Sequence, residues 1–198
     1  MPIITLSREL GSRGDDVAVA VAGRLSLRLV GREIINRAAQ SAGTGEIALA
    51  DIDELGLLGV KPTAAALARY REKITEVIEE QAAQGNVLLV GRGGRVVLRG
   101  RPGVLHVRIA APPDRRIATV SSRCNVSPEV AAARIAASDR ARATFLMRTF
   151  GVRWDDPALF DVVLNMAQLS VQAAADILCA GALAVTSLAP DAPQEGCA

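Results

Sequence analysis

The chain has 198 residues, half of which are hydrophobic, and a formal net charge of +2. This length suits one compact domain with a large core, and the small net charge argues against a nucleic-acid-binding protein. The three cysteines are far apart and lack metal-ligand spacing, which favours a reducing compartment. There is no signal sequence and no uncharged apolar stretch long enough to span a bilayer, so we expect a soluble cytoplasmic protein that binds neither nucleic acid nor membranes.

The N-terminal stretch predicts a strand, a small-residue turn and a helix in close succession. Residues 3–7 form a short apolar run with β-branched residues, and residues 17–25 are apolar and Ala-rich. The turn between them contains small residues and, at the helix start, two acids: Gly11, Ser12, Gly14, Asp15 and Asp16. Backbone N–H groups that converge at a helix N-terminus form an anion site. We therefore expect a phosphate site here, with an ordinary tight turn as the alternative.

The turn has the spacing of a phosphate-binding loop, Gly-x-x-x-x-Gly-Lys-Ser/Thr, but unusual residues occupy it. Arg8 and Arg13 stand at the places of the two glycines. Gly14 replaces the lysine, and Asp15 replaces the hydroxyl residue. Arg8 or Arg13 could supply the missing positive charge from another backbone position. Asp15 could hold Mg²⁺ through its carboxylate, directly or through a water molecule.

The rest of the chain alternates between predicted helices and strands. Further helices are expected over residues 32–42 and 62–83, from 115, from a cap at 127, and over 171–179; further strands are expected over 29–30, 87–90, 104–110, 160–165 and 183–187. This alternation predicts an α/β fold with a mainly parallel sheet. Ligands of such sheets bind at the carboxyl ends of the strands, where the loops after Leu6, Val90 and Ala110 lie. The lone histidine, His106, is interpreted as a strand residue rather than a ligand or base.

Arginines gather in short clusters along the chain: Arg8/Arg13, Arg92/Arg95, Arg115/Arg116/Arg123 and, with an acid, Asp139/Arg140/Arg142. Arginine forms planar, bidentate contacts to phosphate. Phosphoryl transfer needs such fixed cations, because donor and acceptor phosphates repel each other and the transition state spreads its charge. No Ser/His/Asp or Cys/His set suitable for nucleophilic catalysis is evident in the sequence.

Four segments resemble, in order, the cytidylate kinase-like proteins, relatives of bacterial cytidylate kinase among the P-loop nucleoside monophosphate kinases: residues 7–14, 90–93, 139–142 and 155–165. The resemblance covers residues 3–179. It implies a three-layer P-loop kinase-like parallel sheet flanked by helices, as one domain over 1–187 with a small helical lid at about 112–150; residues 188–198 are expected to be a disordered tail. It also implies that ATP and Mg²⁺ serve to phosphorylate a CMP- or dCMP-like acceptor. A homodimer is left open.

The resemblance assigns roles to individual residues. Gly11, Ser12, Arg13, Gly14, Asp15 and Asp16 match the loop for the donor phosphates. Arg92 matches an arginine that holds the acceptor, Asp139 matches a residue that binds its ribose, and Arg142 one that binds its phosphate. Arg116 matches a lid arginine. We expect catalysis to depend on four arginines: Arg8, Arg13, Arg116 and Arg142.

The chain also departs from cytidylate kinases. Gly93 stands where they have an aspartate, and Thr119 and Val120 stand at the lid's arginine pair, with Arg123 as a stand-in. A non-catalytic nucleotide-binding module, a pseudo-kinase that senses nucleotide level, is therefore an alternative, and an oligomeric scaffold built on helix 62–83 is a third. Single residues have plainer interpretations too: Asp139 and Arg142 as a solvated helix face, Asp155 and Asp156 as loop caps, and Trp154 as packing at the lid base.

Overall fold

The described part of the protein contains one parallel sheet of five strands. The computed structural model describes residues 1–31, 41 and 63–187. The strands are β1 (Ile3–Arg8), β2 (Arg28–Val30), β3 (Val87–Val90), β4 (Val104–Ala110) and β5 (Val162–Asn165), in the order β2-β3-β1-β4-β5. Every adjacent pair is parallel. The predicted α/β class is thus confirmed. The tail at 188–198 and, apart from Ser41, the predicted helix over 32–42 lie outside the described residues.

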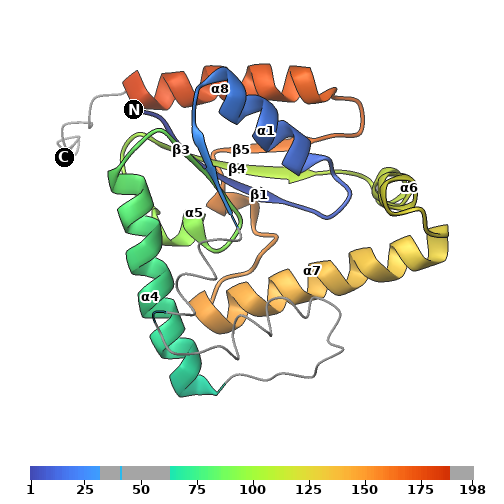
Figure 1. The fold of residues 1–198 in the computed structure, drawn as a ribbon, viewed down its shortest axis with the longest axis horizontal. Coiled ribbons are helices and arrows are strands. Elements are labelled where there is room, and N and C mark those ends of the chain that lie inside the picture. Colours follow the sequence, from blue (N-terminus) through green and yellow to red (C-terminus); the bar gives the residue numbers. More distant parts are fainter. Residues whose placement is uncertain (32–40, 42–62, 188–198) are drawn as a thin grey trace, which may run out of the picture.

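Helices cover both faces of this sheet and make three layers (Figure 1). The described helices are α1 (Gly14–Arg24), α4 (Ala64–Ala83), α5 (Gly94–Val97), α6 (Pro113–Cys124), α7 (Pro128–Phe150) and α8 (Val171–Ser187), with a short 3-10 helix at Pro157–Leu159. The helices α1 and α8 lie on one face, and α4, α5 and α7 lie on the other.

Each face of the sheet has its own core. Ile4, Leu6 and Val107 pack with α1 and α8, whereas Ile3 and Leu89 pack with the apolar stripe of α4 on the opposite face. Because both faces are covered, the central strands read as continuous apolar runs, as buried parallel strands do. The sequence could therefore locate β1, β3 and β4 without strict alternation of polar and apolar residues.

The strand predicted over 183–187 is wrong, because α8 continues through these residues to Ser187. Leu178 and Ala182, four residues apart, are both fully buried. The hydroxyl of Thr186 donates a hydrogen bond to the carbonyl of Ala182 at 2.7 Å, which is a helical spacing. A short apolar run fits a buried helix as well as a strand.

The predicted lid residues form α6 and α7. The cap predicted at Ser127 is confirmed: its side chain accepts a hydrogen bond from the Val130 N–H, and Pro128 follows in the first turn. The helix α7 ends at Gly151, which has a φ of 68° in the left-handed region that glycine tolerates. That these helices move as a lid remains a prediction. Within the described parts of the chain, no helix is long and apolar enough to cross a membrane.

Candidate functional site

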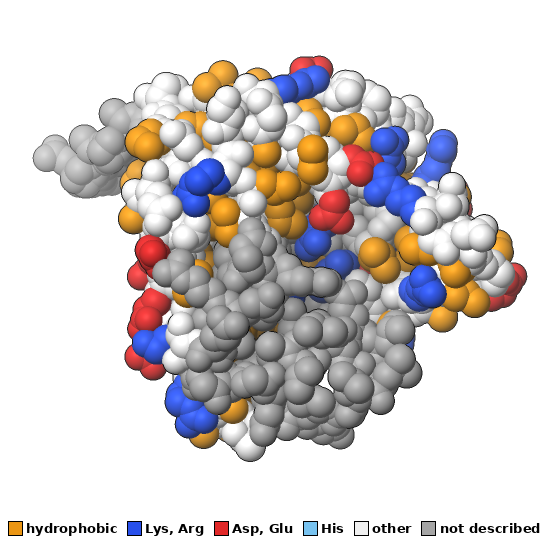
Figure 2. Space-filling model, in the orientation of Figure 1, with side chains coloured by type: hydrophobic (Ala, Val, Ile, Leu, Met, Phe, Trp, Pro, Cys, Tyr) orange, Lys and Arg blue, Asp and Glu red, His pale blue; other side chains and the backbone are white. Residues whose placement is uncertain are grey.

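The loops after β1 and β3 leave the sheet on opposite faces. In the sheet, β1 lies beside β3, but β1 leads into α1 on one face, and β3 leads into α5 on the other. Adjacent strands whose connections diverge in this way leave a crevice at their carboxyl ends, which is where α/β sheets bind ligands. Figure 2 shows acidic and basic side chains gathered near the centre of one face of the molecule, where its surface is hollowed.

The loop between β1 and α1 is tightly wound around a serine. The hydroxyl of Ser12 donates a hydrogen bond to the Glu9 carbonyl at 2.8 Å and accepts one from the Gly14 N–H at 3.3 Å. Gly11 has a φ of 82°, and Arg13, the residue before α1, has a φ of 64°. The turn thus delivers the first N–H groups of α1, which lack partners within the helix, to the edge of the sheet.

Three arginines pair with the two acids at the start of α1. Arg8 Nε donates to Asp15 Oδ1 at 2.8 Å, and Arg13 Nε donates to Asp16 Oδ2 at 3.0 Å. Arg123, from α6, also donates to Asp16. The hydrogen bond from Arg123, followed by that from Arg13, lowers the pKa of Asp16 below its usual value. Arg123 therefore reaches the loop from α6, where the sequence had named it as a stand-in for lid arginines.

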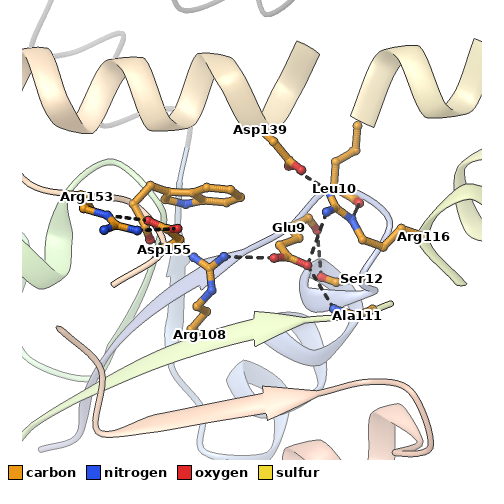
Figure 3. Close-up of polar contacts among 10 residues, drawn as sticks. Glu9, Leu10, Ser12, Arg108, Ala111, Arg116, Asp139, Arg153 and Asp155 are labelled. Atoms are coloured by element: carbon orange, nitrogen blue, oxygen red, sulfur yellow. Dashed lines mark hydrogen bonds and ion pairs between the residues drawn. The ribbon is translucent and has the colours of Figure 1, made fainter. Parts of the chain in front are cut away.

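Glu9 connects this loop to β4 and α6 (Figure 3). Its carboxylate accepts hydrogen bonds from Arg108 Nη2 at 3.0 Å and from the backbone N–H of Ala111 at 3.1 Å, and it lies 3.5 Å from Arg116 Nη1. The side chains of Glu9 and Arg108 are only 15% and 8% exposed. Sequence reasoning did not single out either residue, although an arginine inside the apolar run of β4 was a signal that could have found Arg108.

Arg116 holds the loop between β1 and α1 against α6 and α7. Its Nε donates to the Leu10 carbonyl at 2.7 Å, and its Nη2 donates to Asp139 Oδ1 at 2.7 Å. The backbone of Arg116 is also close, because a Cβ added at Gly11 would lie 2.6 Å from its carbonyl oxygen. The structure thus brings together Arg116 and Asp139, two residues that the sequence assigned to the site, beside the predicted donor loop.

The second glycine-rich turn carries Arg92 at the end of β3. Arg92 and Gly93 have φ values of 65° and 80°, and a Cβ added at Gly93 would lie 2.4 Å from the ring of Phe150. Arg8 lies close to this second turn, since its Nη1 is 3.2 Å from the position of a Cβ added at Gly91. Arg142 follows Asp139 by three residues on α7, so the two share a helix face.

Two buried arginines bind the segment after α7, one from α5 and one from β4. Arg95 Nη2 donates to the Arg153 carbonyl at 3.2 Å, and Arg108 Nη1 donates to the Trp154 carbonyl at 2.9 Å. The Arg108 guanidinium also lies over the Trp154 ring, 4.4 Å from its centroid. Burial, with the nearby charge of Arg108, lowers the pKa of Arg95 to about 10. Trp154 is buried, as its predicted packing role requires.

Asp155, Asp156 and His106 have structural partners. Asp156 caps the 3-10 helix by accepting from the Ala158 N–H at 3.0 Å, as predicted, and Asp155 pairs with Arg153. His106 lies in β4, as predicted, and its Nδ1 is 2.7 Å from the hydroxyl of Thr5. Burial lowers the pKa of His106.

Metal ligands are sparse in this region. Among the residues that the structure describes, no three or more His, Cys, Asp or Glu side chains form a group that could hold a metal ion. Asp15 is an exposed carboxylate, and one of its oxygens is bonded to Arg8. Mg²⁺ is usually held by one or two carboxylates together with substrate phosphates, so this donor set fits an ion that arrives with a nucleotide.

A family model described as the cytidylate kinase-like family matches residues 3–168. The chain belongs to this family. The match includes both glycine-rich loops, α6, α7 and β5, and it confirms the resemblance seen in the sequence.

Solved structures share the fold of this family member. An uncharacterized protein from Eubacterium ventriosum has a TM-score of 0.70 and 18% identity, covering 92% of this chain and 98% of that chain. Protein TT1252 from Thermus thermophilus has a TM-score of 0.57 and 16% identity, covering 92% of this chain and 97% of that chain. Shikimate kinase from Acinetobacter baumannii, in complex with shikimate, has a TM-score of 0.53 and 15% identity, covering 93% of this chain and 94% of that chain. At such identities the likeness shows the fold, which is an α/β kinase fold.

One curated relative is a much longer protein whose name is not that of a kinase. A uronate isomerase from Corynebacterium glutamicum is 26% identical over 114 residues, which make up 58% of this chain and 22% of that protein. The chain therefore spans less than a quarter of that relative's length. Family and fold support a kinase-like phosphotransferase.

Proposed function

We propose that the protein transfers the γ-phosphoryl group of ATP to a CMP- or dCMP-like nucleoside monophosphate. The observation that carries the proposal is the position of Arg8. Its guanidinium lies between the N-terminus of α1, where it bonds Asp15, and the loop of Arg92. A cation between a donor loop and an acceptor loop is suited to the charge that spreads over a transferring phosphoryl group.

The donor side of the proposed site is the loop of residues 11–16. N–H groups at the start of α1 and the cations of Arg8 and Arg13 favour the ATP phosphates. Arg123 would contribute from α6, since it already reaches Asp16. When bound with ATP, Mg²⁺ would neutralise part of the phosphate charge, with Asp15 as the proposed protein ligand.

The acceptor side is Arg92 together with the α7 pair Asp139 and Arg142. Arg92 would hold the acceptor phosphate, as the family resemblance implies. Arg116 fixes Asp139 through the 2.7 Å bond from its Nη2, so Arg116 would act on the acceptor through Asp139. No general base is needed, because an acceptor phosphate is already an anion at neutral pH. Closure of α6 and α7 would exclude water from the transfer.

A second function, a nucleotide-binding module without turnover, is favoured by the ion pairs at the loop. The acids of the chain itself, Asp15 and Asp16, engage Arg8, Arg13 and Arg123. A nucleotide would have to compete with these pairs, and position 14 has no lysine to add charge. Such a protein could bind nucleotide and signal its level to a partner.

The two functions differ in one assay. Purified protein is mixed with ATP-Mg²⁺ and a panel of nucleoside monophosphates, and ADP and the diphosphate product are measured. We expect turnover with CMP or dCMP that falls by about 100-fold or more in Arg92→Ala, while Arg99→Ala, an exposed arginine just after α5, stays near wild type. Nucleotide binding without turnover for any acceptor would favour the module, and turnover in Arg92→Ala equal to wild type would refute the role of Arg92.

A further inference from the structure

Arg8 and Gly14 compete for one space. A Cβ added at Gly14 would lie 2.5 Å from Arg8 Cβ and 3.0 Å from Arg8 Cγ. Real Cβ atoms do not approach other carbon atoms so closely, and the near end of a side chain cannot swing away. Gly14 lies in α1 without a positive φ, so its backbone does not require glycine. The close approach of Arg8 explains the missing side chain, with the Cβ of Ile109 as a second and looser neighbour at 3.2 Å.

A side chain at position 14 would therefore clash with the side chain at position 8. In the usual phosphate-loop pattern the lysine stands at the position of Gly14. This chain has its cation at the end of β1 instead, and the stem of that cation occupies the space that a residue at 14 would need. Compared with the usual pattern, the chain keeps one positive charge near the loop but carries it on β1 instead of α1.

The head of Arg8 is held in a defined place. Its Nε donates to Asp15 Oδ1 at 2.8 Å, its side chain is 22% exposed, and its Nη1 lies against Gly91, next to Arg92. A bond through Nε leaves the edge formed by Nη1 and Nη2, which is a fork that matches two phosphate oxygens.

We propose that Arg8 does the work of the phosphate-loop lysine and that Asp15 is a positioning residue that holds the guanidinium through Nε. The inference rests on the proposed function and makes it more specific: among the arginines near the loop, Arg8 contacts the transferred phosphoryl group. Asp15 acts on the nucleotide through Arg8, in addition to any metal it holds.

The clash between positions 8 and 14 can be tested with paired substitutions. Arg8→Gly removes both the charge and the obstructing Cβ, and it is then combined with Gly14→Lys or, as the matched control, with Gly14→Ala. ATP affinity is measured by calorimetry, and turnover is measured in the same preparations. We expect Arg8→Gly to weaken ATP binding by about 10- to 100-fold, the value of a lost charge-assisted contact. Lysine at 14 should restore about 10-fold or more over alanine at 14.

Two results would overturn the role of Arg8: ATP affinity in Arg8→Gly equal to wild type, or no advantage of lysine over alanine at 14. If the glycine variants fail to fold, Arg8→Met keeps the stem and removes the charge, and wild-type affinity in it would also overturn the proposal. If wild-type protein binds ATP but phosphorylates no acceptor, the transfer proposal fails while the affinities still test Arg8. If it binds no ATP, both fail.

The positioning role of Asp15 has its own test. Asp15→Asn keeps an oxygen that can accept from Arg8 Nε, whereas Asp15→Ala does not. We expect Asp15→Ala to weaken ATP binding about 5-fold or more, with most of the affinity kept in Asp15→Asn, and the same ratio with and without Mg²⁺. A loss that appears only with Mg²⁺, and equally in both variants, would make Asp15 a metal ligand and overturn the positioning role.

Discussion

Glu9 offers the sharpest test of how the site is held together, because its carboxylate contacts β4, the residue that follows β4, and α6. Replacing it by alanine removes the carboxylate that pairs with the Arg108 guanidinium and accepts a hydrogen bond from the Ala111 N–H. The two side chains of the pair are 15% and 8% exposed. Breaking a buried pair from one side costs about 3–5 kcal/mol. Because Glu9 keeps some contact with water, we take the lower end and expect Glu9→Ala to cost roughly 3 kcal/mol.

The measurement is urea unfolding followed by circular dichroism, with thermal melting as a second readout. A loss of about 3 kcal/mol lowers Tm by roughly 6–12 °C for a chain of this size. Glu9→Gln, which keeps the shape and one acceptor oxygen, should lose about half as much free energy of unfolding. The control is Asp176→Ala, which breaks an ion pair with Arg24 whose side chains are 72% and 38% exposed and should cost at most about 1 kcal/mol. If Glu9→Ala costs no more than Asp176→Ala, Glu9 does not tie the loop to β4 and α6.

Three other predictions use the backbone and the buried histidine. Arg13 has a left-handed φ of 64°, so Arg13→Gly should be about 1 kcal/mol more stable than Arg13→Ala in urea unfolding; equal stabilities would show that this residue is not strained. Gly93→Ala should lower the free energy of unfolding by about 2 kcal/mol or more, because the new Cβ would lie 2.4 Å from the Phe150 ring. The double variant Gly93→Ala, Phe150→Ala should lose less stability than the sum of the two single variants. Strict additivity would contradict a contact between the two residues. Burial lowers the folded-state pKa of His106 below the ordinary histidine value of 6.5. As pH falls below about 6.5, the unfolded chain therefore takes up a proton first and the free energy of unfolding decreases. His106→Gln should weaken this pH dependence below about pH 6.5, and an unchanged slope would rule out His106 as its source.

The sequence predicted the elements whose signals are local. The apolar runs of β3 and β4, the cap at Ser127 and the glycine-rich turns all lie within a few residues of the structure they specify. The order of strands and helices then indicated the parallel sheet and the edge at which its loops meet. By contrast, α8 was mistaken near its end, because an apolar stretch of Ala, Leu and Val has no period that separates a buried helix from a strand.

The site could be predicted only in outline. Arg8, residues 11–16 and Arg92 were assigned to the site from glycines and arginines that are neighbours in the sequence. Glu9 was missed because its partners, Arg108 and Ala111, lie 99 and 102 residues further along the chain, and nothing beside Glu9 distinguishes it from an exposed glutamate. The interlock of Arg8 and Gly14 was also out of reach, since it depends on the distance at which β1 and the first turn of α1 face each other.

Arg116 contacts the loop before α1 and the helix α7 at the same time. One residue bonds the Leu10 carbonyl with its side chain, bonds Asp139 on α7, and places its own carbonyl against Gly11. The shape of the predicted donor loop and the placement of α6 and α7 thus depend on one shared residue. By thermodynamic reciprocity, a nucleotide that favours one arrangement of these helices binds more tightly, by the same factor, whenever some other molecule has already stabilised that arrangement.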